Sequence, residues 1–411
     1  MGPSGNWKIH LESSDVNLSW YDDTFNSTLV ATNKFNINHI TDVKEFKKGN
    51  SNFITLNLHH VVNIINQLSL LNRMSEVLNK ELVNVINDDV AKLIIDFSYE
   101  GLVREDWFYS IHRMIKKTKL NTSNIYFISN DNKLGENYDT WINRHNVPKI
   151  NIIELNRYLE EAKPWIRDID KFPIEDFKGD RIREKKFTCL NGAYRVHRSK
   201  IVSELFRSGL DKDGYISYIG NYGEGLPIES DLLPELDTDT IKYFIDNLVP
   251  RLPIVVDLEK DVELIEPYIG SSYVHEMYTN SYFNIITETS YNFDKTIIGN
   301  NVYLTEKTYR PMFGMQPFIL VSNPGCLNQL RNMGFETFPE FFDESYDEIE
   351  NPWHRMDAIL VQIKEICSLS YEEIHDRYYS IFWKLEANRN RLIEIADDRE
   401  INYGNYTNVF E

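Results

Sequence analysis

The sequence predicts an α/β fold of two doubly wound lobes that face a cleft, followed by a helical C-terminal tail. Three observations predict it. A strand–helix–strand pattern occurs twice, polar residues follow the apolar strands, and a stretch of mixed charge with two prolines separates the two patterns. A chain of 411 residues also suits two cores better than one, because a domain usually holds about 100–200 residues.

Composition narrows the class of protein. Hydrophobic residues make up 42% of the chain and charged residues 26%, which is typical of a folded protein and excludes a largely disordered one. The 44 basic and 63 acidic side chains give a formal charge of −19, so the surface as a whole does not attract nucleic-acid phosphates. The only dense basic stretch in the sequence is residues 178–200.

The sequence shows no sign of a secreted or membrane protein. Its three cysteines lie far apart, which favours neither a disulfide framework nor a structural zinc site. The N-terminal residues contain no apolar run suited to a signal peptide, and no window approaches the roughly 18 apolar residues of a membrane span. We therefore expect a cytoplasmic protein without membrane insertion.

The first lobe is placed at residues 1–165. Its expected elements are short strands and loops in the first 55 residues, one or two helices over residues 58–87, a buried strand at Leu93–Phe97, a helix at Trp107–Lys117, a strand in NIYFISND and a strand at Ile150–Leu155. The strand at Leu93–Phe97 ends in polar residues that include Asp96 and Glu100.

A linker at residues 166–184 is expected to lead to a second lobe at residues 185–369. The expected elements of this lobe are a strand in FTCLNG that ends at Asn191, a helix at Ser199–Ser208, a strand in YISYIGN, an irregular insertion at residues 222–250, and strands in SYFNIITETS and PFILVSNPG. Residues 370–411 form the tail, where Ser370 and Glu373 make a capping-box pattern that opens one long helix, Tyr371–Ala396.

The strongest candidate site is the segment VYLTEKTYRP. Thr305 can cap a helix whose first turn contains Glu306 and Lys307, and the free backbone N–H groups of such a turn attract anions. Arg310 lies three residues after Lys307, so both cations can reach one diphosphate. The alternative is an ordinary helix start on the surface, with a solvated lysine.

Two weaker candidates lie upstream. Arg195 and Arg198 flank the start of a helix after the strand that ends at Asn191, a place suited to phosphate, although a solvated basic turn is the alternative. His197 between them is more often structural than catalytic. Glu288 follows the apolar run FNII, where its carboxylate can accept hydrogen bonds from ribose hydroxyls or be a plain loop glutamate.

These segments, taken in order, resemble the C-terminal signature of the α1,3-fucosyltransferase family. That family has a Phe-Glu-Asn-Ser stretch, then Tyr-(Ile/Val)-Thr-Glu-Lys, a basic residue and a strand bearing proline; this chain has FNIITETS and YLTEKTYRPMFGMQPFILV. The likeness covers roughly residues 186–340 and extends to glycosyltransferase-like proteins of tailed phages. The gap after TETS is longer here, and Thr289 replaces the family's Asn, which leaves the donor open.

The resemblance implies a GT-B-like pair of Rossmann-like lobes. A sugar linked to GDP or UDP would bind the second lobe, and the acceptor would be a glycan, a small glycoside or a hydroxymethylated base of phage DNA, in the host cytoplasm if a phage encodes the protein. Arg198 or Arg195 would hold the diphosphate together with Lys307. Glu306 would orient Lys307 or reach the ribose, Tyr303 would flank the nucleotide, and Glu288 would lie near the sugar.

Transfer to a hydroxyl also needs a general base, for which Glu100 is the first candidate and Asp96 the second. We expect an inverting reaction without a metal or other cofactor. Three Asp-x-Asp pairs match the pattern of metal-dependent transferases, but such matches arise easily by chance among 63 acidic residues. The alternative to an enzyme is a binding or structural protein that shares the scaffold without turnover. The sequence leaves the oligomeric state open.

Overall fold

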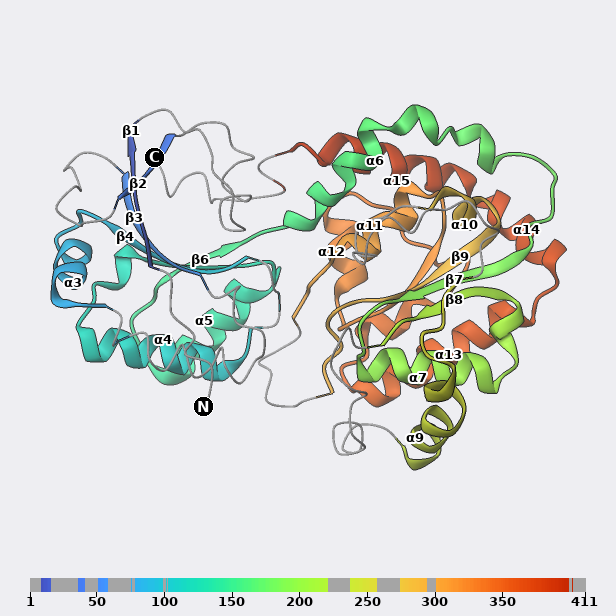
Figure 1. The fold of residues 1–411 in the computed structure, drawn as a ribbon, viewed down its shortest axis with the longest axis horizontal. Coiled ribbons are helices and arrows are strands. Elements are labelled where there is room, and N and C mark those ends of the chain that lie inside the picture. Colours follow the sequence, from blue (N-terminus) through green and yellow to red (C-terminus); the bar gives the residue numbers. More distant parts are fainter. Residues whose placement is uncertain are drawn as a thin grey trace. The chain divides into compact units, whose positions relative to one another are not determined.

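The structure, a computed structural model, consists of two compact α/β units (Figure 1). Unit 1 comprises Met1–Arg157, Asp294–Tyr303 and Asp398–Glu411, and unit 2 comprises Tyr158–Phe293 and Leu304–Asp397. The residues that the structure describes are 9–15, 36–40, 51–57, 75, 78–98, 101, 103–220, 237–256, 274–293, 301–398 and 401. The helices expected within residues 58–74 and the candidate base Glu100 lie outside the described residues.

This division differs in detail from the boundaries expected from the sequence. The segment expected as a linker, residues 166–184, belongs to unit 2, and so do residues 370–397 of the expected tail. Residues 294–303 return to unit 1 from the middle of the second lobe. The chain therefore passes between the two units four times.

Unit 1 is built on a six-stranded sheet with the order β2-β1-β3-β4-β5-β6. Strands β3 to β6 are parallel, and β1 pairs antiparallel with both β2 and β3. The strands are β1 (Ile9–Asp15), β2 (Asn36–Ile40), β3 (Ser51–Asn57), β4 (Lys92–Phe97), β5 (Ile125–Ser129) and β6 (Asn151–Glu154). The strands predicted at Leu93–Phe97 and Ile150–Leu155 are thus confirmed as β4 and β6.

Three helices lie along one side of this sheet, the lower side in Figure 1: α3 (Lys80–Asn87), α4 (Glu105–Thr118) and α5 (Leu134–His145). The core between them and the sheet contains Leu93 and Ile95 of β4 and Trp107 of α4, all with no exposed surface. Ile94 and Asp96, which alternate with these strand residues, are buried as well. A strand buried on both faces needs a continuous apolar run, which is what the sequence of β4 contains.

The returning segment Asn301–Tyr303, called the strap below, is bound tightly within unit 1. The backbone N–H of Val302 donates to Asp131 (3.0 Å), and its carbonyl accepts from Asn132 (2.8 Å). The Asn301 amide also donates to Asp131 and to the Gly101 carbonyl (3.3 Å). Burial raises the pKa of Asp131 to about 7. The buried Tyr303 ring packs so closely on Gly101 that a β-carbon there would overlap it.

Unit 2 is built on a four-stranded parallel sheet with the order β10-β9-β7-β8. Its strands are β7 (Lys185–Asn191), β8 (Gly214–Tyr218), β9 (Ser281–Thr287) and β10 (Phe318–Val321). From β7 the chain moves outward to β8 and then crosses back to β9 on the other side of β7. The order therefore reverses between β7 and β9, and in such sheets ligands bind beside the carboxyl ends of the two strands at the reversal.

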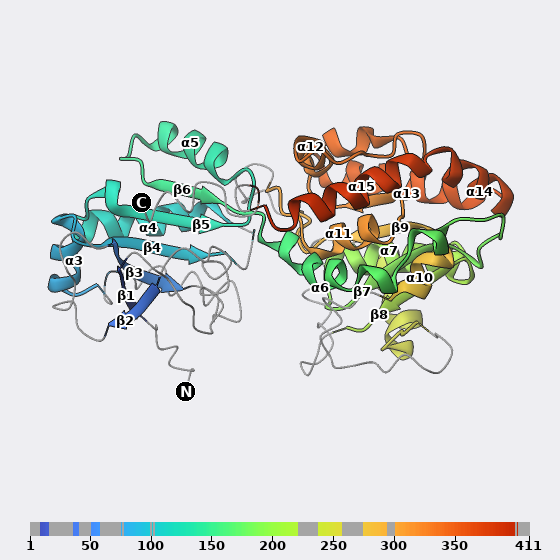
Figure 2. The same ribbon diagram turned by 90° about the horizontal axis from the view of Figure 1, so that it is seen from above.

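Helices cover both faces of this sheet. In Figure 1, α7 (Val196–Arg207) and α13 (Pro352–Ser368) lie below it, and α11 (Glu306–Phe313) and α15 (Phe382–Ile395) lie above it; Figure 2 shows the same elements from above. The remaining helices are α6 (Lys163–Arg167), α9 (Thr238–Tyr243), α10 (His275–Thr279), α12 (Cys326–Asn332) and α14 (Tyr371–Ser380). No helix in the described part of the chain has the length and apolar character needed to cross a membrane.

The C-terminal helix is the clearest difference from the sequence expectation. The capping box of Ser370 and Glu373 is confirmed, with both reciprocal hydrogen bonds present. However, the single helix expected at Tyr371–Ala396 is two helices, α14 and α15, that meet at Ile381. No glycine or proline marks this break. Tertiary packing sets it, since Ile381 is buried and the buried Tyr378 donates its hydroxyl to the Met315 carbonyl (2.7 Å).

Replacing Gly101 with alanine tests the packing of the strap. The added β-carbon would overlap the Tyr303 ring, so the substitution should lower the free energy of unfolding by about 1–3 kcal/mol. Gly192→Ala is the matched control, because nothing lies within 4 Å of its added β-carbon. Urea unfolding monitored by circular dichroism measures both variants. Equal stability of the two would contradict the close contact between Gly101 and Tyr303.

Candidate functional site

The candidate site lies in unit 2, at the carboxyl ends of β7 and β9 where the strand order reverses. Asn191 ends β7 and Thr287 ends β9. The Thr287 hydroxyl donates to the Asn191 side-chain oxygen (2.5 Å), which fastens the two strand ends to each other. The segments that follow them lead to α7 and α11, and these segments carry the charged residues of the site.

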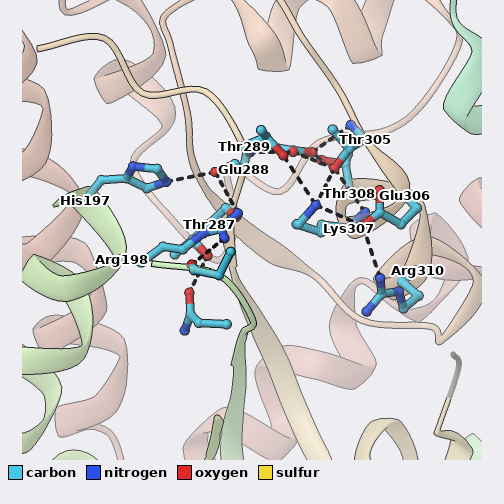
Figure 3. Close-up of polar contacts among 12 residues, drawn as sticks. His197, Arg198, Thr287, Glu288, Thr289, Thr305, Glu306, Lys307, Thr308 and Arg310 are labelled. Atoms are coloured by element: carbon cyan, nitrogen blue, oxygen red, sulfur yellow. Dashed lines mark hydrogen bonds and ion pairs between the residues drawn. The ribbon is translucent and has the colours of Figure 1, made fainter. Parts of the chain in front are cut away.

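Glu288, the first residue after β9, organises this region although its side chain is fully buried. One carboxylate oxygen accepts from the Thr305 backbone N–H (2.9 Å) and the Thr308 hydroxyl (2.6 Å). The other accepts from the Thr305 hydroxyl (2.6 Å) and the Thr289 N–H (3.1 Å), as Figure 3 shows. The carboxylate, expected to meet ribose hydroxyls or the sugar, is thus occupied by protein donors that hold the first turn of α11 at the end of β9.

Lys307 lies in that first turn. Thr305 caps the helix, as predicted, by accepting from the Lys307 backbone N–H (3.4 Å). The Lys307 ammonium lies within reach of the hydroxyls of Thr305 (3.1 Å) and Thr289 (3.4 Å) and the Glu306 carboxylate (2.8 Å). Its side chain is 25% exposed, and these three contacts fix the position of the ammonium group.

Glu306 interacts with two cations. Besides Lys307, the Arg310 guanidinium lies 3.4 Å from the same carboxylate oxygen. Burial by itself would raise the pKa of Glu306, but Lys307 and Arg310 hold that pKa below its ordinary value. The Glu288 and Glu306 carboxylates balance these two cations, so the excess of positive charge in the site comes from Arg195 and Arg198 at the start of α7 and from the N-terminal end of α11.

Arg198, in the first turn of α7, is the most unusual group of the site. Its side chain is 4% exposed. It donates to the carbonyls of Ala193 (2.9 Å), Thr287 (3.3 Å) and Glu288 (3.4 Å). Among the described residues no carboxylate pairs with it, and its buried Nε has no hydrogen-bond partner there. Burial, reinforced by Arg195, lowers the pKa of Arg198 to about 10. The carboxylates of Glu288 and Glu306 offset the burial of this cation only in part, so an anion bound beside Arg198 would stabilise its charge further.

The neighbours of Arg198 complete the α7 side of the site. Burial and the Arg198 charge lower the pKa of His197 well below its ordinary value, so its ring is neutral and its Nε2–H donates to the Glu288 carbonyl (2.8 Å). His197 is therefore structural. The Arg195 side chain is exposed and donates to the carbonyl of Tyr194 (2.9 Å).

Unit 2 brings together most of the residues predicted from the sequence. They are Asn191, Arg195, Arg198, Glu288, Thr305, Glu306, Lys307 and Arg310. Tyr303 instead belongs to unit 1, where its ring is buried against Gly101. Sequence reasoning missed Thr289 and Thr308, whose hydroxyls contact Lys307 and Glu288. Thr308 lies three residues after the capping Thr305, and this helical spacing could have indicated that both hydroxyls lie on the same side of α11.

Asp96, a candidate base, lies in unit 1 near the end of β4. Its side chain is 2% exposed, and one oxygen accepts from the Ser98 backbone N–H (2.8 Å). The other oxygen has no hydrogen-bond partner among the described residues. Burial raises the pKa of Asp96 to about 6. This second oxygen is also buried, so an acceptor hydroxyl could reach it only after a local rearrangement.

In the ranges that the structure describes, no three His, Cys, Asp or Glu side chains are grouped in a way that would hold a metal ion. No protein-family model matches the chain, and no curated protein matches it either.

Glu288→Gln tests the central carboxylate. An amide group cannot accept the bonds that the second carboxylate oxygen accepts from Thr305 and Thr289, so buried donors lose a partner. We expect the free energy of unfolding to fall by about 1–3 kcal/mol. Chemical denaturation measures it, with Glu365→Gln on the exposed side of α13 as the control, for which a change within about 0.5 kcal/mol is expected. A Glu288→Gln protein as stable as this control would show that the carboxylate does not hold α11.

Proposed function

We propose that the protein is a glycosyltransferase that moves a sugar from a GDP- or UDP-linked donor to an acceptor hydroxyl. In this proposal units 1 and 2 are the two lobes of a GT-B fold, and unit 2 binds the donor. The observation that carries the proposal is the buried Arg198, which lacks a carboxylate partner among the described residues at the point where the strand order reverses. The resemblance of the surrounding motifs to α1,3-fucosyltransferases supports the same reading.

The charges of the site suit the chemistry of glycosyl transfer. Cleavage of a glycosyl–phosphate bond leaves negative charge on the departing nucleoside diphosphate. Arg198 and Lys307 would neutralise it from α7 and α11, Arg195 is exposed beside Arg198, and the positive end of the α11 dipole would add to their charge. Because Glu288 and Glu306 fix these groups before a ligand binds, little reorganisation accompanies the reaction.

Unit 1 supplies the candidate bases. A base must accept a proton from the acceptor hydroxyl, and it works best when its pKa lies near the working pH. The pKa of Asp96, raised by burial to about 6, meets this condition. Glu100 follows Asp96 by four positions in the sequence and remains part of the proposal. Tyr303, packed on Gly101, is assigned to holding the strap just before α11 and not to the nucleotide.

We infer that the sugar is transferred without a metal, since the side chains above supply the cationic charge that the diphosphate needs. Inversion follows if the acceptor hydroxyl attacks the donor directly, with one general base and no covalent intermediate. The acceptor remains either a glycan, a small glycoside or a hydroxymethylated base in DNA. The net charge of −19 favours the first two, because duplex DNA would be repelled by most of an acidic surface.

A second candidate is a nucleotide-binding protein without turnover. The burial of Asp96 favours this candidate. Only 2% of Asp96 is exposed, whereas a catalytic base must contact the acceptor hydroxyl. Both candidate proteins would bind the donor, so a measurement of sugar transfer distinguishes between them.

Thermal shift with a panel of nucleoside diphosphates tests donor binding. We expect stabilisation by GDP or UDP. In Lys307→Ala the affinity should fall roughly 10–100-fold, the value of one charge-assisted hydrogen bond. Lys364→Ala is the matched control, since Lys364 also pairs with a glutamate, Glu204, at 3.1 Å. Absence of any shift with the wild-type protein would remove the proposal.

Asp96→Asn and Glu100→Gln test the base. The variant that removes the base should bind the donor as the wild type does but transfer sugar about 10²–10⁴-fold more slowly. If Asp96 is the base, wild-type transfer should rise as the pH increases through about 6, because only the deprotonated carboxylate accepts a proton. Mass spectrometry of the sugar product measures the rate. Transfer that is undiminished in both variants would exclude both residues.

A further inference from the structure

Four aromatic rings in unit 2, His197, Tyr291, Phe293 and Trp353, form a continuous row that we call the aromatic ladder. The ring centroids of His197 and Tyr291 are 5.5 Å apart with the rings nearly parallel, at 21°. Tyr291 is 4.8 Å from Phe293, and Phe293 is 4.7 Å from Trp353. These separations are those of interacting aromatic pairs, so the four rings pack as one unit.

The inner end of the ladder is buried and its outer end is exposed. His197 and Tyr291 are 3% and 8% exposed, Phe293 is intermediate, and Trp353 is 37% exposed. The exposed apolar surface of Trp353 is unfavourable in water, and a flat ligand stacked on the ring would remove that surface from water. Only the outer end of the ladder can therefore meet a ligand.

The ladder begins at the candidate anion site. His197 precedes Arg198 in the first turn of α7, and its ring nitrogen donates to the Glu288 carbonyl. Tyr291 comes two residues after Thr289, whose hydroxyl lies 3.4 Å from the Lys307 ammonium. Two residues of extended chain span at most about 7 Å, so the backbone of Tyr291 lies within that distance of the Thr289 backbone.

The surroundings of Trp353 hold it in place. Asn351 caps α13 and accepts from the backbone N–H groups of Trp353 (3.0 Å) and His354 (3.1 Å). The Tyr291 hydroxyl donates to the Pro352 carbonyl (2.6 Å), which ties the inner ladder to the same turn. The Arg355 guanidinium lies 4.6 Å from the centre of the Tyr291 ring. A platform fixed in this way loses little conformational entropy when a ligand binds.

We propose that Trp353, backed by Phe293, is the stacking platform for the nucleobase of the nucleoside diphosphate held at Arg198 and Lys307. This inference rests on the proposed function and adds to it the contact that distinguishes a nucleotide from a bare pyrophosphate. The cations recognise only phosphate charge, whereas an aromatic face recognises the flat base. Since every base has such a face, Trp353 supplies affinity for the nucleoside, and the choice between guanine and uracil lies with other groups.

Calorimetric titration of the full chain with GDP, UDP and inorganic pyrophosphate tests the platform. In Trp353→Ala the Kd of the preferred nucleoside diphosphate should rise about tenfold, the usual effect of losing one aromatic stacking partner, while the Kd of pyrophosphate stays within about twofold. Trp353→Phe should keep most of the affinity. Trp383→Ala is the matched control, because Trp383 is a 58% exposed tryptophan on α15, and it should change neither constant.

The outcomes separate this inference from the proposed function. If Trp353→Ala binds the nucleoside diphosphate as tightly as the wild type, the platform is excluded and the donor site stands. If it weakens pyrophosphate equally, Trp353 acts only through the packing of the site, and the platform is again excluded. If the wild-type protein binds pyrophosphate but no nucleoside diphosphate, or neither, the donor site itself is wrong and the platform falls with it.

Discussion

The buried carboxylate of Glu288 is the interaction on which the candidate site depends. It receives four hydrogen bonds, from Thr305, Thr308 and the adjacent Thr289, and so joins the end of a central strand to the first turn of α11. A buried carboxylate is tolerated only when such donors or a cation compensate it. Here the donors come from the helix start itself. The same contacts that make the charge tolerable therefore hold the first turn of α11, which carries Lys307, against the end of β9 (Figure 3).

The two units distribute buried charge differently. In unit 1 the buried acids Asp96 and Asp131 lie at the ends of parallel strands, and desolvation raises the pKa of each towards neutrality. In unit 2 the corresponding edge holds two buried carboxylates, Glu288 and Glu306, together with four cations, Arg195, Arg198, Lys307 and Arg310. The whole chain has a net charge of −19, so this local excess of positive charge is opposite in sign to the chain as a whole. The proposed transfer from a diphosphate donor would need a proton acceptor and an anion-binding group, which is why these two sets of residues carry the proposal.

Local patterns in the sequence predicted the elements whose signals are local. The strands β4 and β6 follow from short apolar runs, and the caps at Thr305 and Ser370 follow from residue type and spacing. The break at Ile381 and the burial of Arg198 could not be predicted, because both arise from contacts between residues distant in sequence. The place of Glu288 at a strand end follows from the apolar run before it, but its bonding to Thr305 and Thr308 depends on contacts between residues 17 and 20 positions apart. The membership of Tyr303 in unit 1, one residue before the chain enters unit 2, likewise depends on distant contacts.

The return of the strap to unit 1 has a practical consequence for dissecting the molecule. A recombinant fragment that stops at Arg157 would contain Asp131 without the donors of Asn301 and Val302, and Gly101 without the ring that covers it. This truncation exposes apolar surface and removes two hydrogen-bond donors from the Asp131 carboxyl group. If the fragment is poorly soluble, that result does not show whether the complete unit 1 can fold by itself. Isolating either half requires a circularly permuted or co-expressed design that keeps residues 294–303 with the first half.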